Sequence, residues 1–160
     1  MSGAGFTLDP RLQADTRHVA MLPLCELRLM DDARYPWLVL VPRRTGMVEI
    51  ADLAEAEQAQ LWREANQAAA ALRAVAPCDK LNLGALGNIV RQLHLHVVAR
   101  TQDDAVWPGP VWGSGAAVPY AAEALATRLS SLRQKLEELK SAAMDGRPFD
   151  SRDRGWSQKP

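Results

Sequence analysis

The chain has 160 residues, a length typical of one globular domain of roughly 100–200 residues. Its 19 basic and 19 acidic residues cancel to a formal net charge of zero, which argues against a nucleic-acid-binding protein with clustered excess Lys and Arg. A hydrophobic share of 48% against 24% charged residues excludes a disordered chain.

Cysteine usage and the apolar runs indicate the compartment. Cys25 and Cys78 form neither a CxxC pair nor a disulfide framework, so we expect a reducing environment. The first fifteen residues lack the basic and apolar regions of a secretory signal. The strongest apolar strand, Trp37–Val41, is far shorter than the ~20 residues of a membrane helix. The sequence therefore predicts a soluble, cytoplasmic protein with neither a membrane nor a nucleic acid as partner.

The first third of the chain alternates short apolar runs with turn residues. Val19–Leu24 and Cys25–Met30 are strand-like runs, and Trp37–Val41 is a third one that Pro42 ends. The polar segment Asp31–Arg34 supplies a turn between the last two runs, so we expect an antiparallel hairpin there.

A long helix is expected next. Asp52 with Glu55 three residues later is typical of a capped helix start, and the helix continues to Val75, before Pro77. Its flat alanine-rich face suits close packing on a sheet or on a second copy of the chain, which predicts a homodimer. The periodic apolar positions are Leu61, Ala65, Ala68, Leu72 and Val75.

A second helix is predicted over Tyr120–Ala143, where leucines recur at spacings typical of one buried helix face. We expect residues 1–145 to form a single domain. The Gly- and Pro-containing segment 146–160 is expected to be a C-terminal tail.

The segment between the two helices holds most of the candidate chemistry. Leu81–Leu83 predicts a short strand, Gly84–Asn88 a glycine-bearing loop, and Ile89–Arg100 an alternating strand. With a strand period of two, Arg91 is expected to point away from the histidine face. That face carries Asn88, Gln92, His94, His96 and Arg100.

Two imidazoles and an amide on a rigid strand suit phosphate chemistry. Imidazole acts near neutral pH as a nucleophile or a general acid and base, and its protonated form neutralises a phosphate oxygen. The Gly84–Asn88 loop can turn backbone N–H groups toward an anion. The pattern indicates a phosphoester or phosphoanhydride bound over this strand.

The segment Gln92-Leu93-His94-Leu95-His96-Val97-Val98 resembles a known motif. It is similar to His-φ-His-φ-His-φ-φ, with φ apolar, of the histidine triad (HIT) superfamily of nucleotide hydrolases and transferases, with glutamine in place of the first histidine. Trp37–Arg44 and Trp107-Pro108 are similar to family patterns as well. The resemblance covers residues 19–112 and implies an α+β fold, a five-stranded antiparallel sheet with helices, usually paired as a homodimer.

The resemblance implies a role for each matching residue. His94 matches the middle histidine, which attacks the α-phosphorus to give a nucleotidyl-histidine that water cleaves. His96 matches the third histidine, which helps to neutralise developing charge, and Gln92 is expected to hold a phosphate oxygen or the leaving group. Asp31 falls near the ribose-binding acidic position. Phosphate-contacting positions fall on Asn82, Gly87 and Asn88, although these polar residues are also typical of turns.

Three functions follow as hypotheses. The first is a cofactor-free hydrolase or transferase acting on a small purine nucleotide conjugate, a phosphoramidate or a dinucleoside polyphosphate. The second is a nucleotide-binding module that catalyses poorly, because Gln92 and Trp37 stand where family members have histidines. The third is a His-x-His zinc enzyme, for which His18, Cys25 or Asp31 would have to supply a third ligand through folding.

Overall fold

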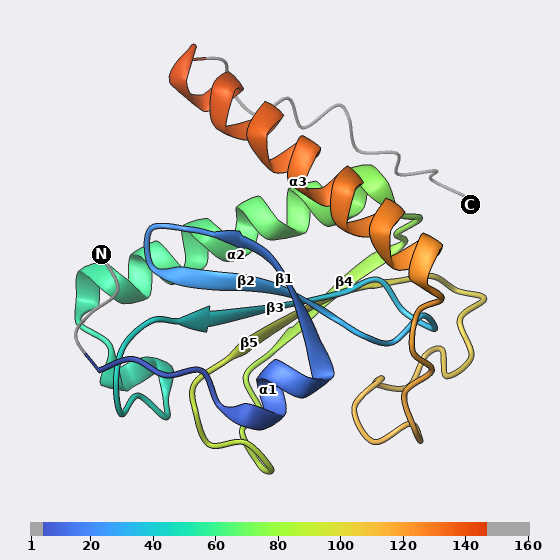
Figure 1. Ribbon diagram of the computed structural model, residues 1–160, viewed down its shortest axis with the longest axis horizontal. Helices are drawn as coiled ribbons and strands as arrows, with labels where there is room; N and C mark the ends of the chain where they lie inside the picture. The colour runs from blue at the N-terminus through green and yellow to red at the C-terminus, as the bar shows by residue number, and fades with distance from the viewer. Residues whose placement is uncertain (1–4, 147–160) are drawn as a thin grey trace.

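The computed structural model describes residues 5–146 (Figure 1). Apart from Gly146, the predicted tail lies outside the described residues. The helices and strands follow in the order α1 (Pro10–Asp15), β1 (Thr16–Met21), β2 (Cys25–Met30), β3 (Trp37–Pro42), the 3₁₀ turn η1 (Ile50–Asp52), α2 (Glu55–Val75), β4 (Lys80–Gly84), β5 (Leu95–Arg100) and α3 (Ala122–Met144).

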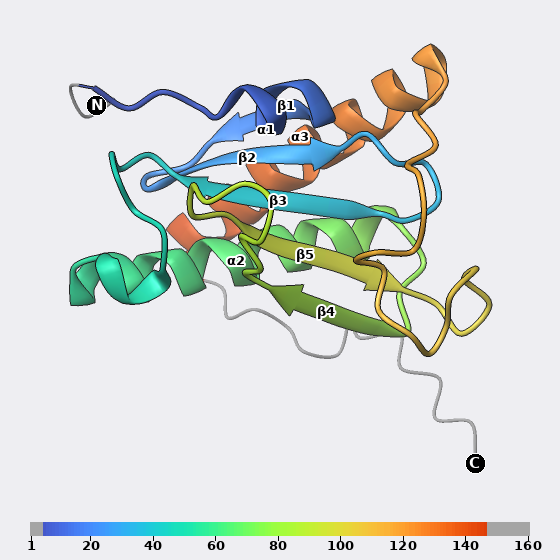
Figure 2. The same cartoon turned by 90° about the horizontal axis from the view of Figure 1, so that it is seen from below.

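The five strands form one antiparallel sheet in the order β1-β2-β3-β5-β4 (Figure 2). This confirms the expected α+β fold. The predicted hairpin is β2 and β3, in which Leu27 lies opposite Leu40 and Leu29 opposite Leu38. Apolar pairs placed directly opposite each other stabilise a sheet by roughly 0.2–1 kcal/mol each, so the alternation of these runs fixes the register.

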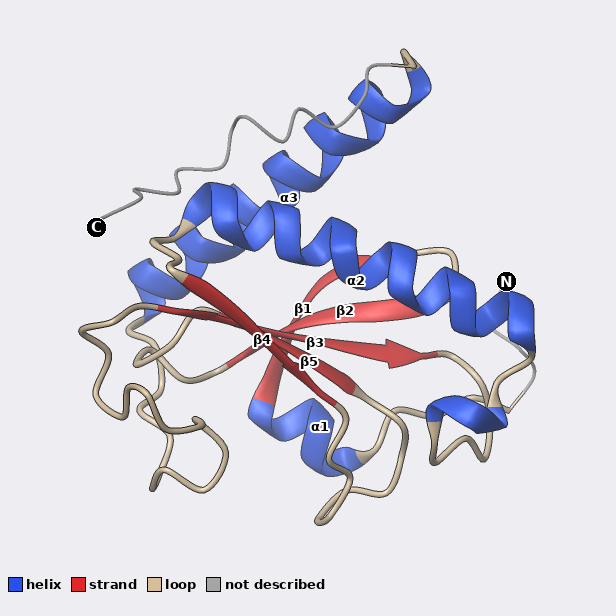
Figure 3. Cartoon of the chain, turned by 180° about the vertical axis from the view of Figure 1, so that it is seen from behind, coloured by secondary structure: helices blue, strands red, loops and turns tan. Residues whose placement is uncertain are grey.

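The two long helices cover the same face of the sheet (Figure 3). Helix α2 lies on β3 and β5 and packs against α3. Its alanine-rich stripe, including Ala65 and Ala68, is fully buried in the main core against leucines of β2, β3 and β5 and against Leu132 of α3. This flat face is therefore used within the protomer. None of the helices among residues 5–146 is long and apolar enough to cross a bilayer.

The opposite face of the sheet carries a second apolar cluster. Its strand members are Trp37, Val39, Val41 and Val98. The segment before α1, the helix α1 itself and the loop after β5 pack over it, and Figure 3 shows α1 across the sheet from α2 and α3. The covering side chains are Phe6, Leu8, Leu12, Val106, Val111 and Trp112.

The structure corrects two sequence predictions. The strand predicted over Ile89–Arg100 begins only at Leu95, because β4 ends at Gly84, opposite His96, and leaves the preceding residues without a strand partner. The N–H of Leu93 instead donates to the carbonyl of Met47.

Asp52 does not cap the long helix. Its carboxylate accepts hydrogen bonds from the backbone N–H groups of Val48 and Glu49 and closes the η1 turn. Helix α2 begins three residues after Asp52, at Glu55, with Ala54 at the N-cap position. The capping pattern in the sequence therefore marks a turn that precedes the helix.

Candidate active site

His94 and His96 lie side by side at the start of β5, on the sheet face opposite α2 and α3. Their rings meet edge to face, with centroids 4.8 Å apart. Both residues are buried, at 7% and 6% exposure. Two imidazoles thus share one largely dehydrated environment.

A carbonyl group orients the His94 ring. Nδ1 of His94 lies 2.6 Å from the backbone oxygen of Gln92, and because a carbonyl oxygen can only accept, Nδ1 carries the hydrogen. In the neutral imidazole this leaves the lone pair on Nε2. His94 also lines a cavity of about 450 Å³. The arrangement is that of a nitrogen nucleophile beside a space large enough for a small ligand.

An indole orients the His96 ring. Nε1–H of Trp37 donates to Nδ1 of His96 over 2.9 Å. Because indole is only a donor, Nδ1 of His96 carries the lone pair, and its hydrogen lies on Nε2. Burial, reinforced by the charge of His94, lowers the pKa of His96 to about 3. His96 is therefore a neutral N–H donor at physiological pH.

Trp112, from the loop after β5, packs against this pair. Its ring lies edge to face with those of Trp37 and His96, at centroid distances of 6.2 and 5.7 Å. It fits because Gly84 lies opposite His96 on the neighbouring strand. A Cβ on Gly84 would lie 3.3 Å from Cη2 of Trp112. Sequence reasoning offered no pairing for Trp112, because the loop that carries it has no periodic pattern.

The loop between β4 and β5 lines the cavity beside His94. The predicted phosphate-contacting residues Gly87 and Asn88 are both in the lining, and Gly87 adopts φ +68°, a left-handed conformation that favours glycine. Leu86 and Ile89 add apolar surface.

Arg91 also lines the cavity, together with His94 and Glu49. The expectation that Arg91 points away from the site is wrong, because it rested on a strand alternation that the irregular segment 89–93 does not have. Among the described residues that line the cavity, Arg91 is the only Lys or Arg. No signal in the sequence separates this arginine from a solvated one.

Gln92 is bound to the N-terminal segment. Its Nε2 donates to the carbonyl of Thr7 over 2.8 Å, and its Oε1 accepts from the N–H of Asp9 over 2.9 Å. Gln92 also lines the cavity. Its amide is thus held by backbone groups more than eighty residues away in the sequence.

Asp31 and Asn82 do not line the cavity. Asp31 follows β2, pairs with Arg17 at 2.7 Å and accepts a hydrogen bond from the N–H of Tyr120. It lies at the other end of the sheet from His94. Oδ1 of Asn82 accepts from the buried Arg100. The structure thus uses both residues in hydrogen bonds that stabilise the fold.

The hypothesis of a zinc enzyme requires a third ligand beside His94 and His96. Within residues 5–146 no group of three or more His, Cys, Asp and Glu side chains could hold a metal ion. The candidates have other surroundings. Nδ1 of His18 lies 3.0 Å from Oε1 of Glu26, and Asp31 pairs with Arg17. Cys25 is fully buried in the main core, and burial raises the pKa of its thiol.

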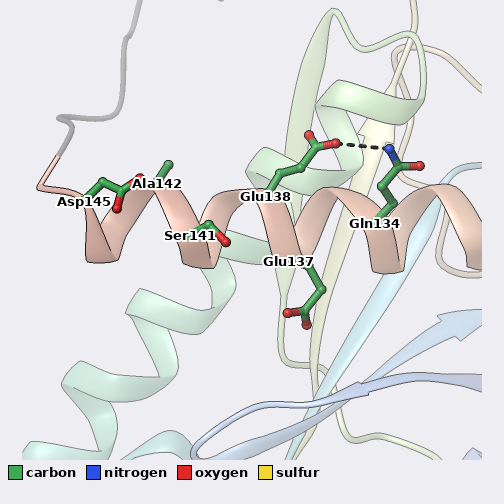
Figure 4. A pocket seen from close by; sticks show the side chains of 6 residues that line it. All are labelled: Gln134, Glu137, Glu138, Ser141, Ala142 and Asp145. Atoms are coloured by element: carbon green, nitrogen blue, oxygen red, sulfur yellow. Dashed lines mark hydrogen bonds between the residues drawn. The ribbon is translucent and has the colours of Figure 1, made fainter.

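A second hollow, of about 550 Å³, lies along the end of α3 (Figure 4). Its lining includes Glu137, Glu138 and Asp145 and contains no basic side chain among the described residues. Such a lining repels phosphate. The cavity beside His94 is therefore the candidate ligand site.

Comparisons with known proteins identify the family of this chain. A family model described as "HIT domain" matches residues 11–103, which include both histidines. A histidine triad protein from Sinorhizobium meliloti 1021 is 47% identical, with a TM-score of 0.80 over 82% of this chain and 97% of that chain. One from Bradyrhizobium japonicum is 46% identical, with a TM-score of 0.80 over 82% and 98%.

A more distant structure shares the fold alone. A hypothetical histidine triad nucleotide-binding protein from Sulfolobus tokodaii strain7 is 16% identical, with a TM-score of 0.61 over 84% of this chain and 93% of that chain. The comparison with curated proteins finds no match.

Proposed function

This chain belongs to the histidine triad (HIT) family, and we propose that it hydrolyses or transfers the nucleotidyl group of a purine nucleotide conjugate through His94. The observation that carries the proposal is the hydrogen bond from Nδ1–H of His94 to the carbonyl of Gln92. It leaves the lone pair on Nε2 of a ring that lines the cavity. We infer a cytoplasmic location as part of this proposal, which the free thiols Cys25 and Cys78 support.

The reaction has two steps. Nε2 of His94 attacks the α-phosphorus, a P–N bond forms, and the bond to the leaving group breaks with its electron pair on the leaving atom. Water then attacks the same phosphorus, the P–N bond breaks with its electron pair returning to Nε2, and the water proton passes to solvent. Nε2–H of His96 donates a hydrogen bond to a phosphate oxygen or to the leaving atom. Splitting one displacement into two is what a covalent nucleophile contributes.

The phosphates are expected to lie along the loop between β4 and β5. Gly87 and Asn88 offer backbone N–H groups there, and Arg91 offers a guanidinium that matches phosphate geometry. Because His96 is neutral, Arg91 is the fixed positive charge near the reacting phosphorus. A leaving group that itself carries phosphate would gain most from this side chain.

A second copy of the chain is the expected protein partner. Within residues 5–146, strand β4 has β5 as its only strand neighbour, and an open edge strand is a template for pairing with another chain. Leu83, Leu86 and Ile89 are exposed at this edge or just after it, Ile89 at 77%. Light scattering at micromolar concentration should report a dimer for the natural chain and for Met21→Lys at the opposite edge. Leu83→Lys should be monomeric, and a monomeric natural chain would contradict the pairing.

A nucleotide-binding module that catalyses poorly is the second candidate. It is favoured by the neutral His96 and by Gln92, whose amide is held by the N-terminal segment and cannot titrate. Neither residue supplies a proton to a basic leaving group as an imidazolium would. This candidate predicts binding of nucleoside monophosphates without turnover.

The test is release of nucleoside monophosphate from adenosine phosphoramidates and dinucleoside polyphosphates. The natural chain should release it, and His94→Asn should not. His18→Asn is the matched control, because His18 lies on β1 and does not line the cavity. Circular dichroism checks that both variants fold. Binding without release by the natural chain would favour the module, and equal release by His94→Asn would overturn the role of His94.

A further inference from the structure

The N-terminal strap, residues 5–9, crosses the histidine face just before α1. Figure 1 shows the segment before α1 and the loop between β4 and β5 on the same side of the sheet. We propose that the strap is a working part of the active site, and that Gln92 is a positioning residue that links the strap to His94. The inference rests on the proposed role of His94 and deepens it.

The link runs through one residue with two functions. Both polar atoms of the Gln92 side-chain amide bind the strap. Nε2 donates to the carbonyl of Thr7, and Oε1 accepts from the N–H of Asp9. Its backbone carbonyl accepts the hydrogen of Nδ1 of His94. Any displacement of the Gln92 backbone therefore changes the direction in which Nε2 of His94 points.

The strap is held by apolar packing as well as by hydrogen bonds. Phe6 and Leu8 pack against the second apolar cluster, whereas Thr7 between them is exposed. Segment 89–93, by contrast, has no strand partner on either side. Its end is held by the hydrogen bonds to the strap, by the bond from Leu93 to Met47 and by burial of the Leu93 side chain in the main core. The strap therefore supplies hydrogen bonds to a segment that lies beyond the end of β4 and has no strand hydrogen bonds of its own.

This arrangement assigns Gln92 a role other than substrate binding. The Oε1 atom and one N–H of its amide are already occupied by the strap. The amide therefore works by holding the loop, and the expectation that it grips a phosphate oxygen or the leaving group is replaced by a positioning role.

The chain offers a matched pair of variants at Asp9. Proline removes the N–H that donates to Gln92, and the backbone of Asp9, at φ −55° and ψ 133°, already suits proline and precedes Pro10. Asp9→Ala keeps that N–H. Both changes remove the carboxylate that accepts from the N–H of Arg11, so their difference isolates the bond to Gln92.

Activity and the His94 tautomer are measured in both variants, each with Gln92 and with Gln92→Ala. With Gln92 present, Asp9→Pro should have a kcat about 2- to 12-fold lower than Asp9→Ala, the range for one neutral hydrogen bond, with KM unchanged. Nitrogen-15 shifts of His94 should show more of the Nε2–H tautomer. With Gln92→Ala, the two Asp9 variants should be equal in both readouts.

Two results would overturn the proposal. One is equal kcat and equal His94 tautomer in Asp9→Pro and Asp9→Ala with Gln92 present, even if their melting temperatures differ. The other is a difference in kcat or in His94 tautomer between Asp9→Pro and Asp9→Ala that remains when Gln92→Ala is also present. If the natural chain releases no nucleotide, the proposed function fails, but the tautomer measurement still decides whether the strap positions His94.

Discussion

The indole N–H of Trp37 donates to Nδ1 of His96 over 2.9 Å. The resemblance implies a titrating histidine near this position in one branch of the family, and Trp37 here is a hydrogen-bond donor that does not titrate. Tryptophan has one N–H and no acceptor. It therefore fixes the tautomer of His96 without adding charge, and His96 keeps its hydrogen on Nε2 at any pH near neutral.

Trp37→Phe should remove the hydrogen bond that fixes the tautomer of His96. Phenylalanine keeps an aromatic ring against His96 and Trp112 but has no N–H. We expect His96 to populate both tautomers, with a several-fold loss of kcat and a destabilisation of about 1–3 kcal/mol from the unpaired buried nitrogen. Nitrogen-15 NMR reports the tautomer directly. Trp62→Phe, at an exposed position on α2, is the control, and an unchanged His96 spectrum in Trp37→Phe would contradict the assignment.

The depressed pKa of His96 predicts how stability depends on pH. In the unfolded chain His96 takes up a proton at its ordinary pKa of 6.5, but in the folded chain only near pH 3. Between these values the unfolded state binds more protons, so the free energy of unfolding falls as the pH falls, by at most about 1.4 kcal/mol per pH unit. Above pH 6.5 His96 is neutral in both states, so this destabilisation is absent there.

Urea unfolding between pH 5 and 7 measures this slope. The free energy of unfolding of His96→Asn should change less with pH than that of the natural chain over that interval, because the variant has no imidazole to protonate at position 96. His18→Asn, which changes a half-exposed histidine, should keep the steep slope. Parallel curves for the natural chain and His96→Asn would contradict burial of a neutral His96.

Gly84→Ala should displace the Trp112 ring from His96. The added methyl would approach Cδ1 of Leu86 at 3.2 Å and Cη2 and Cζ2 of Trp112 at 3.3 and 3.4 Å, and overpacking of this kind costs roughly 1–3 kcal/mol. Phenylalanine at 112 lacks those two atoms. In a Trp112→Phe background the cost of Gly84→Ala should therefore shrink, which a double-mutant cycle by thermal unfolding measures. Additive costs would show that the two residues are not in contact.

Arg91→Gln should weaken binding of substrates whose leaving group carries phosphate. Losing a charged hydrogen bond at a partly solvated site should raise KM about 5- to 10-fold. Phosphoramidates with an uncharged amine leaving group should be affected less. Arg63→Gln on α2, outside the cavity, is the control. Equal losses for both substrate classes would show that Arg91 does not contact the leaving group.

The sheet could be predicted because its residues follow simple periodic rules. Leu38 and Leu40 alternate with Trp37 and Val39, and Pro42 ends the strand, so local pattern and tertiary packing agree. The spacing of the two histidines predicts that they lie together, and their rings are in contact, although His94 precedes the first residue of β5.

The rest of the site depends on contacts that no local pattern reveals. The loop position of Arg91 follows from the early end of β4, and a period-two pattern predicted the opposite face. The partners of Gln92 are backbone atoms of Thr7 and Asp9, which any sequence would supply. The resemblance put Asp31 near a ribose-binding position, but its carboxylate pairs with Arg17 and it does not line the cavity. Each of these outcomes was decided by tertiary contacts.

The most direct test of the account is a search for the covalent intermediate on His94. The natural chain is mixed with a dinucleoside polyphosphate, quenched within milliseconds without acid, and analysed by intact-protein and peptide mass spectrometry. We predict one added nucleoside monophosphate per chain, on the peptide that contains His94, and none in His94→Asn. Turnover by the natural chain with no such adduct at any quench time, together with retained turnover in His94→Asn, would contradict nucleotidyl transfer through His94.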